Sequence, residues 1–238
     1  AAKSTTEDPR LGGTIFSVAE EINNAGGKAL PLQLDIRFED QIESAISQAV
    51  SVFGGIDILV NNASAIQLTG TAQTEAKRFD LMHSINVRGT FLVVQHCLPF
   101  LKKGNNAHIL TLSPPINMLP KWLGPHIAYT MSKFNMSMMA LGWAAEFKKD
   151  GIASNALWPK TTIDTAAVRN LLGGDALAKM SRTVDVLADS AYFILSKENL
   201  VYTGNTFIDE EVLAGEGITD LSKYSVTPGG QLFNDLFV

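Results

Sequence analysis

The stretch of this chain best suited to chemistry is Tyr129-Thr130-Met131-Ser132-Lys133. A tyrosine and a lysine four residues apart lie on the same face of a helix, one turn from each other. An ammonium group beside a phenol stabilises the phenolate and lowers the pKa of the phenol from about 10 toward neutral pH. Such a tyrosine could act as a general acid or base toward a C–O bond. The pair alone is a common pattern in helices, so its interpretation depends on what the rest of the chain places beside it.

The composition predicts a folded protein and argues against nucleic acid as its partner. The chain has 238 residues, of which 46% are hydrophobic and 18% charged, enough for one α/β domain over residues 1–238. A net charge of −5 without a basic run argues against nucleic acid. The only cysteine, Cys97, excludes an internal disulfide. We find no signal peptide and no long apolar run, and so expect no membrane association and a location in the cytoplasm or, in a eukaryote, an organelle matrix.

Two other kinds of active site are not predicted. The four histidines do not have the spacing of metal ligands, so we expect no metal site. A serine hydrolase built on Ser113 would need a Gly-x-Ser-x-Gly turn, and that serine is not in one.

The order of elements predicts a doubly wound parallel sheet, Rossmann-like, with helices on both faces. Helical spacing of apolar residues predicts helices over 14–25, 38–53, 74–102 (with a break near Gly89), 126–149 and 183–196. Compact apolar runs predict strands over 28–34, 56–60, 107–112, 152–157 and 206–208. Strands alternating with helices are typical of this α/β class.

Polar residues follow several predicted strands at the point where each strand ends. They are Asp35, Asn61-Asn62, Ser113, Asn155 and the segment 159–162. Because the carboxyl ends of parallel strands meet at one edge of a sheet, we expect these groups to gather there. Asp35 could instead cap the following helix, and Asn155 is expected to stabilise loops at that edge.

At this point the chain resembles the short-chain dehydrogenase/reductase family. The matching pieces are Asn61-Asn62-Ala63-Ser64, Asn86, Ser113, Tyr129-x-x-x-Lys133 and Asn155-Ala156-Leu157-Trp158-Pro159. Their order and approximate spacing agree from about residue 28 to 210. Within the family, segments 11–15, 61–66, 113–115 and 155–161 look most like the hydroxysteroid dehydrogenase-like proteins.

The resemblance implies an NAD(P)-dependent oxidoreductase with defined catalytic roles. Tyr129 would donate a proton to a carbonyl oxygen, or accept one from an alcohol, as hydride moves between the substrate and the nicotinamide. Lys133 would lower the pKa of Tyr129 and hydrogen-bond the nicotinamide ribose. Ser113 would hydrogen-bond the reacting oxygen, and Asn86 would hold a water that links Lys133 to solvent.

The resemblance also implies a cofactor cleft. Asn61 and Ala63 would line it, Asp35 would contact the adenine, and backbone groups near 159–163 would meet the nicotinamide carboxamide. The implied cofactor-binding set is Asp35, Asn61, Ala63, Tyr129, Lys133, Pro159, Thr161, Thr162 and Lys3.

The largest departure from the family is the lack of a Gly-rich turn between a first strand and a first helix, where the cofactor pyrophosphate binds. The resemblance places residues 1–4 at the end of the second strand. We therefore expect that the chain is a fragment without its first βα unit, with roughly 35–40 residues upstream. An acidic residue at the end of the second strand would bind the ribose hydroxyls of NAD. Because residues 1–6 contain none and Lys3 can pair with a 2′-phosphate, NADP is favoured over NAD.

The substrate is expected to be a small carbonyl or alcohol compound. Loops 114–125 and 160–182 and the tail 215–238 should shape its pocket, and the loop 114–125 should border it. Apolar residues in or near these loops indicate a lipophilic substrate; they are Trp122, Leu123, Trp158, Leu171 and Leu172. The helices at 74–102 and 126–149 are apolar enough to pair two copies, which predicts a homodimer or homotetramer.

A second hypothesis is a catalytically silent dinucleotide-fold module that binds or scaffolds other molecules. The complete set of Ser113, Tyr129, Lys133 and Asn86 favours the enzyme. The missing Gly-rich turn would favour the silent module only if the chain were whole.

Overall fold

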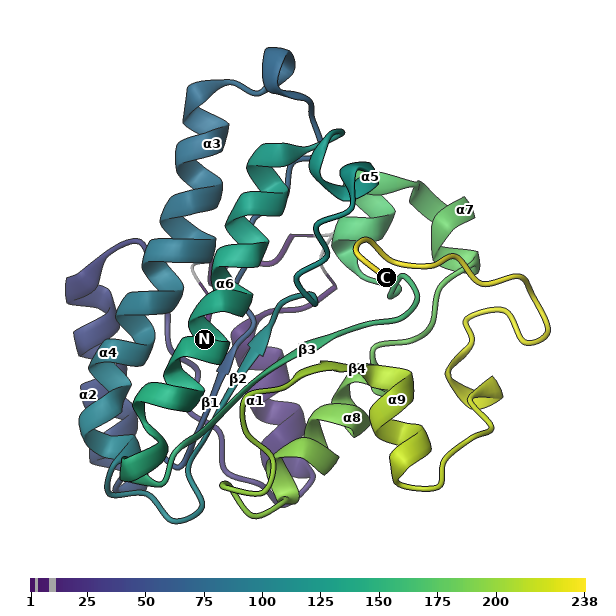
Figure 1. Cartoon of the computed structure of the whole chain (residues 1–238). Helices are drawn as coiled ribbons and strands as arrows, with labels where there is room; N and C mark the ends of the chain where they lie inside the picture. The colour runs from purple at the N-terminus through teal and green to yellow at the C-terminus, as the bar shows by residue number, and fades with distance from the viewer. Residues whose placement is uncertain (3, 9–11) are drawn as a thin grey trace.

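Four parallel strands form a single sheet in a computed structural model of the chain, which describes residues 1–2, 4–8 and 12–238 (Figure 1). In spatial order the strands are β1 (Ile58–Asn61), β2 (His108–Leu112), β3 (Ala153–Trp158) and β4 (Thr206–Ile208). Ile58 pairs with His108, and His108 pairs with Ala153, so the carboxyl ends of β1, β2 and β3 lie at one edge. The predicted fold class, a parallel sheet flanked by helices, is confirmed.

Nine α-helices and five short 3-10 or π-helical segments are found among the described residues. The α-helices are α1 (Ile15–Asn24), α2 (Glu39–Phe53), α3 (Ala76–Met82), α4 (Thr90–Leu101), α5 (Pro120–Leu123), α6 (Ile127–Glu146), α7 (Gly174–Lys179), α8 (Asp185–Ser196) and α9 (Asp209–Gly215). The short segments are Thr71–Gln73, His83–Gly89, Lys148–Asp150, Val168–Leu172 and Ser222–Tyr224. The helices predicted from apolar spacing are present within a few residues, whereas α5 and α9 were not predicted. No helix in the described ranges has both the length and the apolar character needed to cross a bilayer.

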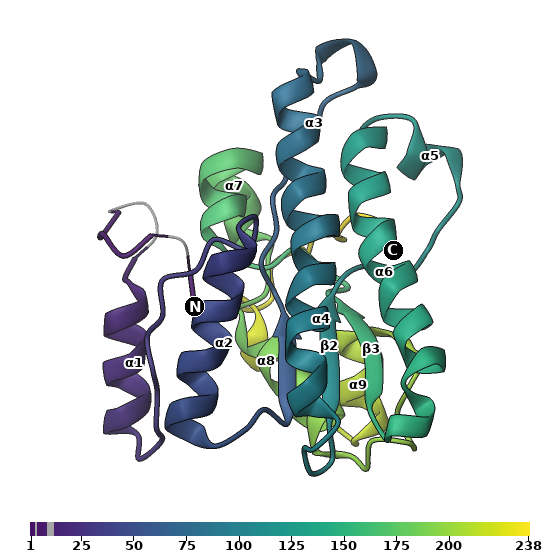
Figure 2. The same cartoon turned by 90° about the vertical axis from the view of Figure 1, so that its left-hand side faces the viewer.

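The two faces of the sheet carry different helices. Ile109 of β2 packs in a core with Cys97 of α4 and Trp143 of α6. The next residue, Leu110, packs with Ile194 of α8 on the opposite face. This alternation follows from the two-residue period of a strand, and Figure 2 shows α4 and α6 in front of the sheet and α8 behind it. A strand buried on both faces reads as a continuous apolar run, which is why β2 was predictable.

The long helix predicted over 74–102 is continuous, and its predicted break is a π-helical segment. α3 leads through His83–Gly89 into α4 without leaving the helical path. A π-turn adds a residue to the helical turn and is common at functional sites. Here the turn contains Asn86, which is fully buried.

The strand predicted over 28–34 is wrong. Within the described residues this segment makes one isolated parallel bridge, between Ala2 and Gln33. Ala2 donates to Leu32 over 3.4 Å and accepts from Leu34 over 2.9 Å. A strand exists only where a partner runs beside it, and apolar composition alone does not supply one.

The end of the chain packs against α6, because Phe237 lies in one cluster with Tyr129 and Phe134, and Figure 2 shows the C-terminus at this helix. The backbone N–H of Thr162 donates to the carbonyl of Phe233 over 2.9 Å, and the N–H of Asp235 donates to the carbonyl of Lys160 over 3.1 Å. We call residues 231–238 the C-terminal segment. Its penultimate residue, Phe237, is 1% exposed and packs against Tyr129, so this segment is part of the core around α6.

The π-helical segment leaves no room for a side chain at Gly89. A Cβ there would lie 2.7 Å from Ile36 Cδ1 and 3.0 Å from the Ile36 carbonyl oxygen. We expect Gly89→Ala to lower the free energy of unfolding by about 1–3 kcal/mol, measured by urea denaturation. Gly215→Ala, at the end of α9 where a Cβ meets nothing within 4 Å, should be neutral or slightly stabilising. Equal effects of the two substitutions would contradict this packing argument.

Candidate active site

Hydrogen bonds at the start and middle of α6 fix this helix against the loop that follows β2. Thr130 Oγ1 donates to the carbonyl of Trp122 over 2.7 Å. Ser137 Oγ donates to the carbonyl of Pro114 over 2.5 Å. The side chains of Tyr129, next to the first of these anchors, and Lys133, between the two, are buried one helical turn apart.

The ammonium group of Lys133 is held at the carboxyl end of β2. Nζ donates to the Leu112 carbonyl over 2.6 Å, lies 3.5 Å from Met136 Sδ, and lies 5.1 Å from the centroid of the Trp158 ring. Burial lowers the pKa of Lys133 to about 7, and the negative charge of Asp235 opposes that effect. The lysine is therefore poised to exchange a proton near neutral pH.

The expected lowering of the Tyr129 pKa is wrong for this structure. Burial raises the pKa of Tyr129, and the negative charge of Asp235 raises it further. Desolvation disfavours the phenolate, and a lysine whose own pKa is near 7 supplies only part of a positive charge to offset it. The arrangement keeps Tyr129 protonated, which suits donation of a proton more than its removal from a substrate.

Ser113 follows β2 directly and is fully buried. Its backbone N–H donates to the Leu157 carbonyl over 3.1 Å, which extends the pairing of β2 with β3. Its hydroxyl has no hydrogen-bond partner among the residues that the structure describes. Burying a hydroxyl without a partner is costly, so a bound ligand or an ordered water is expected to supply the missing bond.

Asn86 joins the turn after β1 to α6. Its amide nitrogen donates to the Ala65 carbonyl and to Ser132 Oγ, each over 2.9 Å, and its oxygen accepts from the Ala65 N–H over 2.8 Å. Ser132 Oγ in turn donates to the Tyr129 carbonyl over 2.8 Å. Both amide protons of Asn86 are thereby used, so the side chain positions the tyrosine helix, and a water held by Asn86 would have to bind another of its atoms.

A cavity of about 610 Å³ brings part of the predicted set together. Of the residues expected to bind cofactor or substrate, Tyr129, Lys133, Pro159 and Thr162 line it. Most other lining side chains are apolar, and they include Ile66, Leu68, Ile163, Val168, Leu171, Leu172, Leu177 and Leu187. The loop 114–125 contributes no lining residue; its Trp122 packs instead against the cluster that contains Tyr129.

Several predicted cofactor residues lie away from the cavity wall. The Asp35 carboxylate binds the Arg37 guanidinium, with a shortest distance of 2.6 Å, and does not cap α2. Asn61 donates to Thr111 Oγ1 over 3.3 Å between β1 and β2. Ala63 is exposed, and Thr161 is buried in a bridge to Asn234. Lys3 lies outside the described residues.

The sequence did not predict that the C-terminal segment contributes a charged side chain to the cavity. Asp235 lines the cavity beside Asn234 and Leu236, and Asn62 and Ser64 line it from the turn after β1. Asp235 stands with Asn234 between two apolar pairs, Leu232-Phe233 and Leu236-Phe237, and only the tertiary fold brings it to α6.

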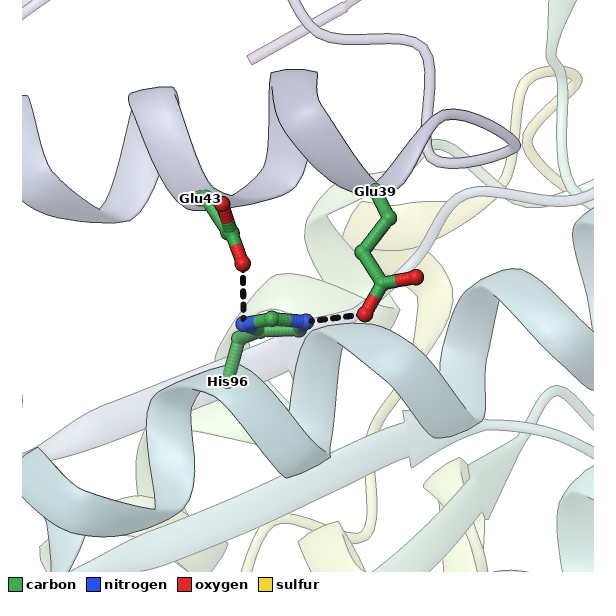
Figure 3. A group of neighbouring side chains, drawn as sticks. All are labelled: Glu39, Glu43 and His96. Atoms are coloured by element: carbon green, nitrogen blue, oxygen red, sulfur yellow. Dashed lines mark hydrogen bonds and ion pairs between the residues drawn. The ribbon is translucent and has the colours of Figure 1, made fainter.

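A second polar cluster lies between α2 and α4 and is separate from the cavity (Figure 3). His96 Nε2 lies 3.1 Å from Glu39 Oε1, and His96 Nδ1 lies 3.9 Å from Glu43 Oε1. Among the described residues these form the one group of three side chains close enough to hold a metal ion. Because each ring nitrogen faces a different carboxylate, the geometry fits two separate contacts of the imidazole better than one shared ion.

Comparison with known proteins decides the family. The short chain dehydrogenase family pattern matches residues 11–174. The chain belongs to the short-chain dehydrogenase family. Its relatives include Hydroxysteroid dehydrogenase-like protein 2 of Xenopus tropicalis, 55% identical over the whole chain and 56% of the relative. The human protein of that name is 52% identical over the whole chain and 56% of its length. The chain thus spans about half the length of the curated relatives it matches.

Solved structures agree with this short-chain dehydrogenase assignment. A short chain dehydrogenase from Mycobacterium thermoresistibile superposes with a TM-score of 0.93 at 52% identity, covering all of this chain and 85% of that one. A short-chain dehydrogenase/reductase from Serratia marcescens superposes with a TM-score of 0.70 at 25% identity, covering 81% of this chain and 80% of that one. The resemblance to the short-chain dehydrogenase/reductase family, stated from sequence motifs, is confirmed.

Removal of the Asn86 side chain should lower the stability of the fold substantially. Asn86→Ala leaves the N–H and carbonyl of Ala65 and the hydroxyl of Ser132 without these partners, so we expect a loss of about 2–4 kcal/mol in the free energy of unfolding. Asn135→Ala is the matched control, because the Asn135 amide makes a single solvent-exposed bond, to the Met131 carbonyl along α6, and its loss should cost little. Urea denaturation of both variants measures the difference. Similar midpoints would mean that Asn86 does not hold the turn against α6.

Proposed function

We propose that the chain carries the catalytic site of an NAD(P)-dependent oxidoreductase that moves hydride between a nicotinamide and a carbonyl or alcohol substrate. One observation carries the proposal: Tyr129 and Lys133, buried one turn apart on α6, open into the same cavity. Family membership supports the same reaction class.

Three residues of the chain would take part in the reaction. In carbonyl reduction the substrate carbon gains a hydride, and Tyr129 gives its phenolic proton to the oxygen, forming an alcohol. Ser113 Oγ would donate to that oxygen, which accounts for its buried, unpartnered hydroxyl. Lys133 would return a proton toward Tyr129, since the low pKa of Lys133 makes that transfer easy at neutral pH.

The residues at the nicotinamide end fit the cofactor. Two of the three N–H groups of the Lys133 ammonium face Leu112 and Met136, and the third would reach a ribose hydroxyl. Pro159 and Thr162 line the cavity at the end of β3 and would border the nicotinamide. When bound, the nicotinamide supplies or accepts the hydride. NADP is proposed over NAD on the sequence argument from Lys3, and tighter binding of NADH than of NADPH would contradict it.

The substrate we propose is lipophilic. Apolar side chains from the turn after β1, from residues 163–177 and from α8 make up most of the cavity wall. Burial of an apolar substrate body against them gains about 25 cal/mol per Å². Turnover confined to small hydrophilic ketones would contradict this choice.

Pairing of two copies through α4 and α6 is also proposed. These helices leave Phe91, Met131 and Met138 between 44% and 60% exposed, and an exposed apolar face of this kind marks an interaction surface. A monomeric mass for the natural full-length protein in light scattering would contradict the pairing.

The role of Tyr129 is tested by Tyr129→Phe. The ring keeps its contact with Phe237 while the acidic hydroxyl is lost, so turnover of ketones should fall by about 10²–10⁴-fold with little change in stability. Tyr192→Phe is the matched control, since Tyr192 is 68% exposed on α8. Assays on a panel of aldehydes and ketones, with NADPH and NADH, measure the effect.

The assays use both this chain and the natural full-length protein. Nucleotide binding is followed in parallel by fluorescence titration, so that loss of chemistry is separated from loss of binding. Full activity of Tyr129→Phe would end the catalytic assignment. Failure of the natural full-length protein to bind either nucleotide would instead favour a silent module.

A further inference from the structure

The C-terminal segment makes several hydrogen bonds to residues at and just after the end of β3, beside the proposed active site. Its backbone pairs with Lys160 and Thr162 after β3. The Leu236 carbonyl accepts from Trp158 Nε1 over 2.8 Å. The Trp158 ring is the one that lies 5.1 Å from Lys133 Nζ, so the segment is linked to the lysine through a single side chain.

The segment also brings a carboxylate to the cavity wall. Of the lining residues in the described ranges, Asp235 is the only acid and Lys133 the only base. Its backbone N–H is held by the Lys160 carbonyl, and its Oδ1 accepts from the Leu236 N–H over 2.6 Å. These bonds fix the side chain at the same end of the cavity as Trp158.

The groups around Lys133 and Asp235 are largely apolar or uncharged. Lys133 meets the Leu112 carbonyl from β2, Met136 from α6 and Trp158 from β3. The second acid near Asp235 is Asp209, at the start of α9. Burial raises the pKa of Asp209 to about 6, and one of its oxygens accepts from the Lys160 N–H over 2.8 Å.

We propose that Asp235 is the positioning residue that supplies the counter-charge to Lys133 and keeps its ammonium protonated for the reaction. This makes the C-terminal segment part of the active site, and it rests on the proposed function. No direct ion pair joins the two groups, so Asp235 acts through the field that it sets up in a cavity with few other charges.

The electrostatics of the site agree with this assignment. Burial raises the pKa of Asp235 to about 7, with Lys133 acting in the opposite sense, and the charge of Asp235 likewise supports the charged form of Lys133. The same negative charge raises the pKa of Tyr129. Asp235 thus favours the state in which both the Tyr129 phenol and the Lys133 amine carry their protons. This is the state that can reduce a carbonyl.

Asp235→Asn in the natural full-length enzyme tests the proposal. Without the carboxylate, Lys133 should lose its proton at a lower pH, so the alkaline limb of the pH profile for ketone reduction should move down by about one pH unit. Asp235→Glu, which restores the charge, should move the limb back toward its original position. Glu146→Gln, an equal charge change at the exposed far end of α6, should leave the profile unchanged.

A loss of kcat without movement of the limb would mean that Asp235 only supports the fold of the C-terminal segment, and would overturn the proposal. An unchanged limb at full activity would overturn it equally. Absence of any Tyr129-dependent reduction in the wild-type enzyme would instead refute the proposed function. The pH dependence of thermal stability would then decide whether Asp235 titrates in the folded protein.

Thermal stability supplies a readout that needs no turnover. The unfolded chain ionises Asp235 near pH 4, whereas the folded chain holds that proton until about pH 7, so this residue makes stability fall as pH rises between those values. Asp235→Asn removes that fall. The Tm of the variant minus that of the wild type should therefore grow from pH 5 to pH 7, and a flat difference would show that Asp235 does not titrate as proposed.

Discussion

The buried ammonium group of Lys133 is the constraint around which this site is arranged. A charge taken out of water is stable only if dipoles and opposite charges replace the lost hydration. The Leu112 carbonyl, the Met136 sulfur and the Trp158 ring supply part of that replacement. These groups come from the end of β2, from α6 and from the end of β3. The strands therefore have to be paired in register before the lysine can be buried.

Two further features hold Tyr129 beside that lysine. The π-helical segment before α4 turns Asn86 inward, where it bonds the turn after β1 and, through Ser132, the backbone of Tyr129. On the other side, Phe237 packs within 6.3 Å of the Tyr129 ring, measured between centroids. The tyrosine is thus fixed by Asn86 from the middle of the chain and by Phe237 from its last residues, which limits the positions that a substrate oxygen can take.

The sequence was informative where local periodicity determines structure and uninformative where distant segments meet. Apolar spacing predicted α1, α2, α6 and α8, and it placed Tyr129 and Lys133 on one helical face. The strand over 28–34 failed because pairing depends on a partner. The sign of the Tyr129 pKa shift failed because burial outweighs a partly charged neighbour. Asp235 was missed because no local pattern relates the C-terminal segment to α6.

The most direct test of the account is the fate of the hydride. The natural full-length protein would be incubated with a lipophilic ketone and nicotinamide cofactor carrying deuterium at C4, using the reduced forms of NADP and NAD in turn. We predict that deuterium appears on the carbinol carbon of the alcohol product, as detected by mass spectrometry. Tight cofactor binding with no deuterium in the product of any ketone would contradict the account and leave a fold that binds the nucleotide without performing the reaction.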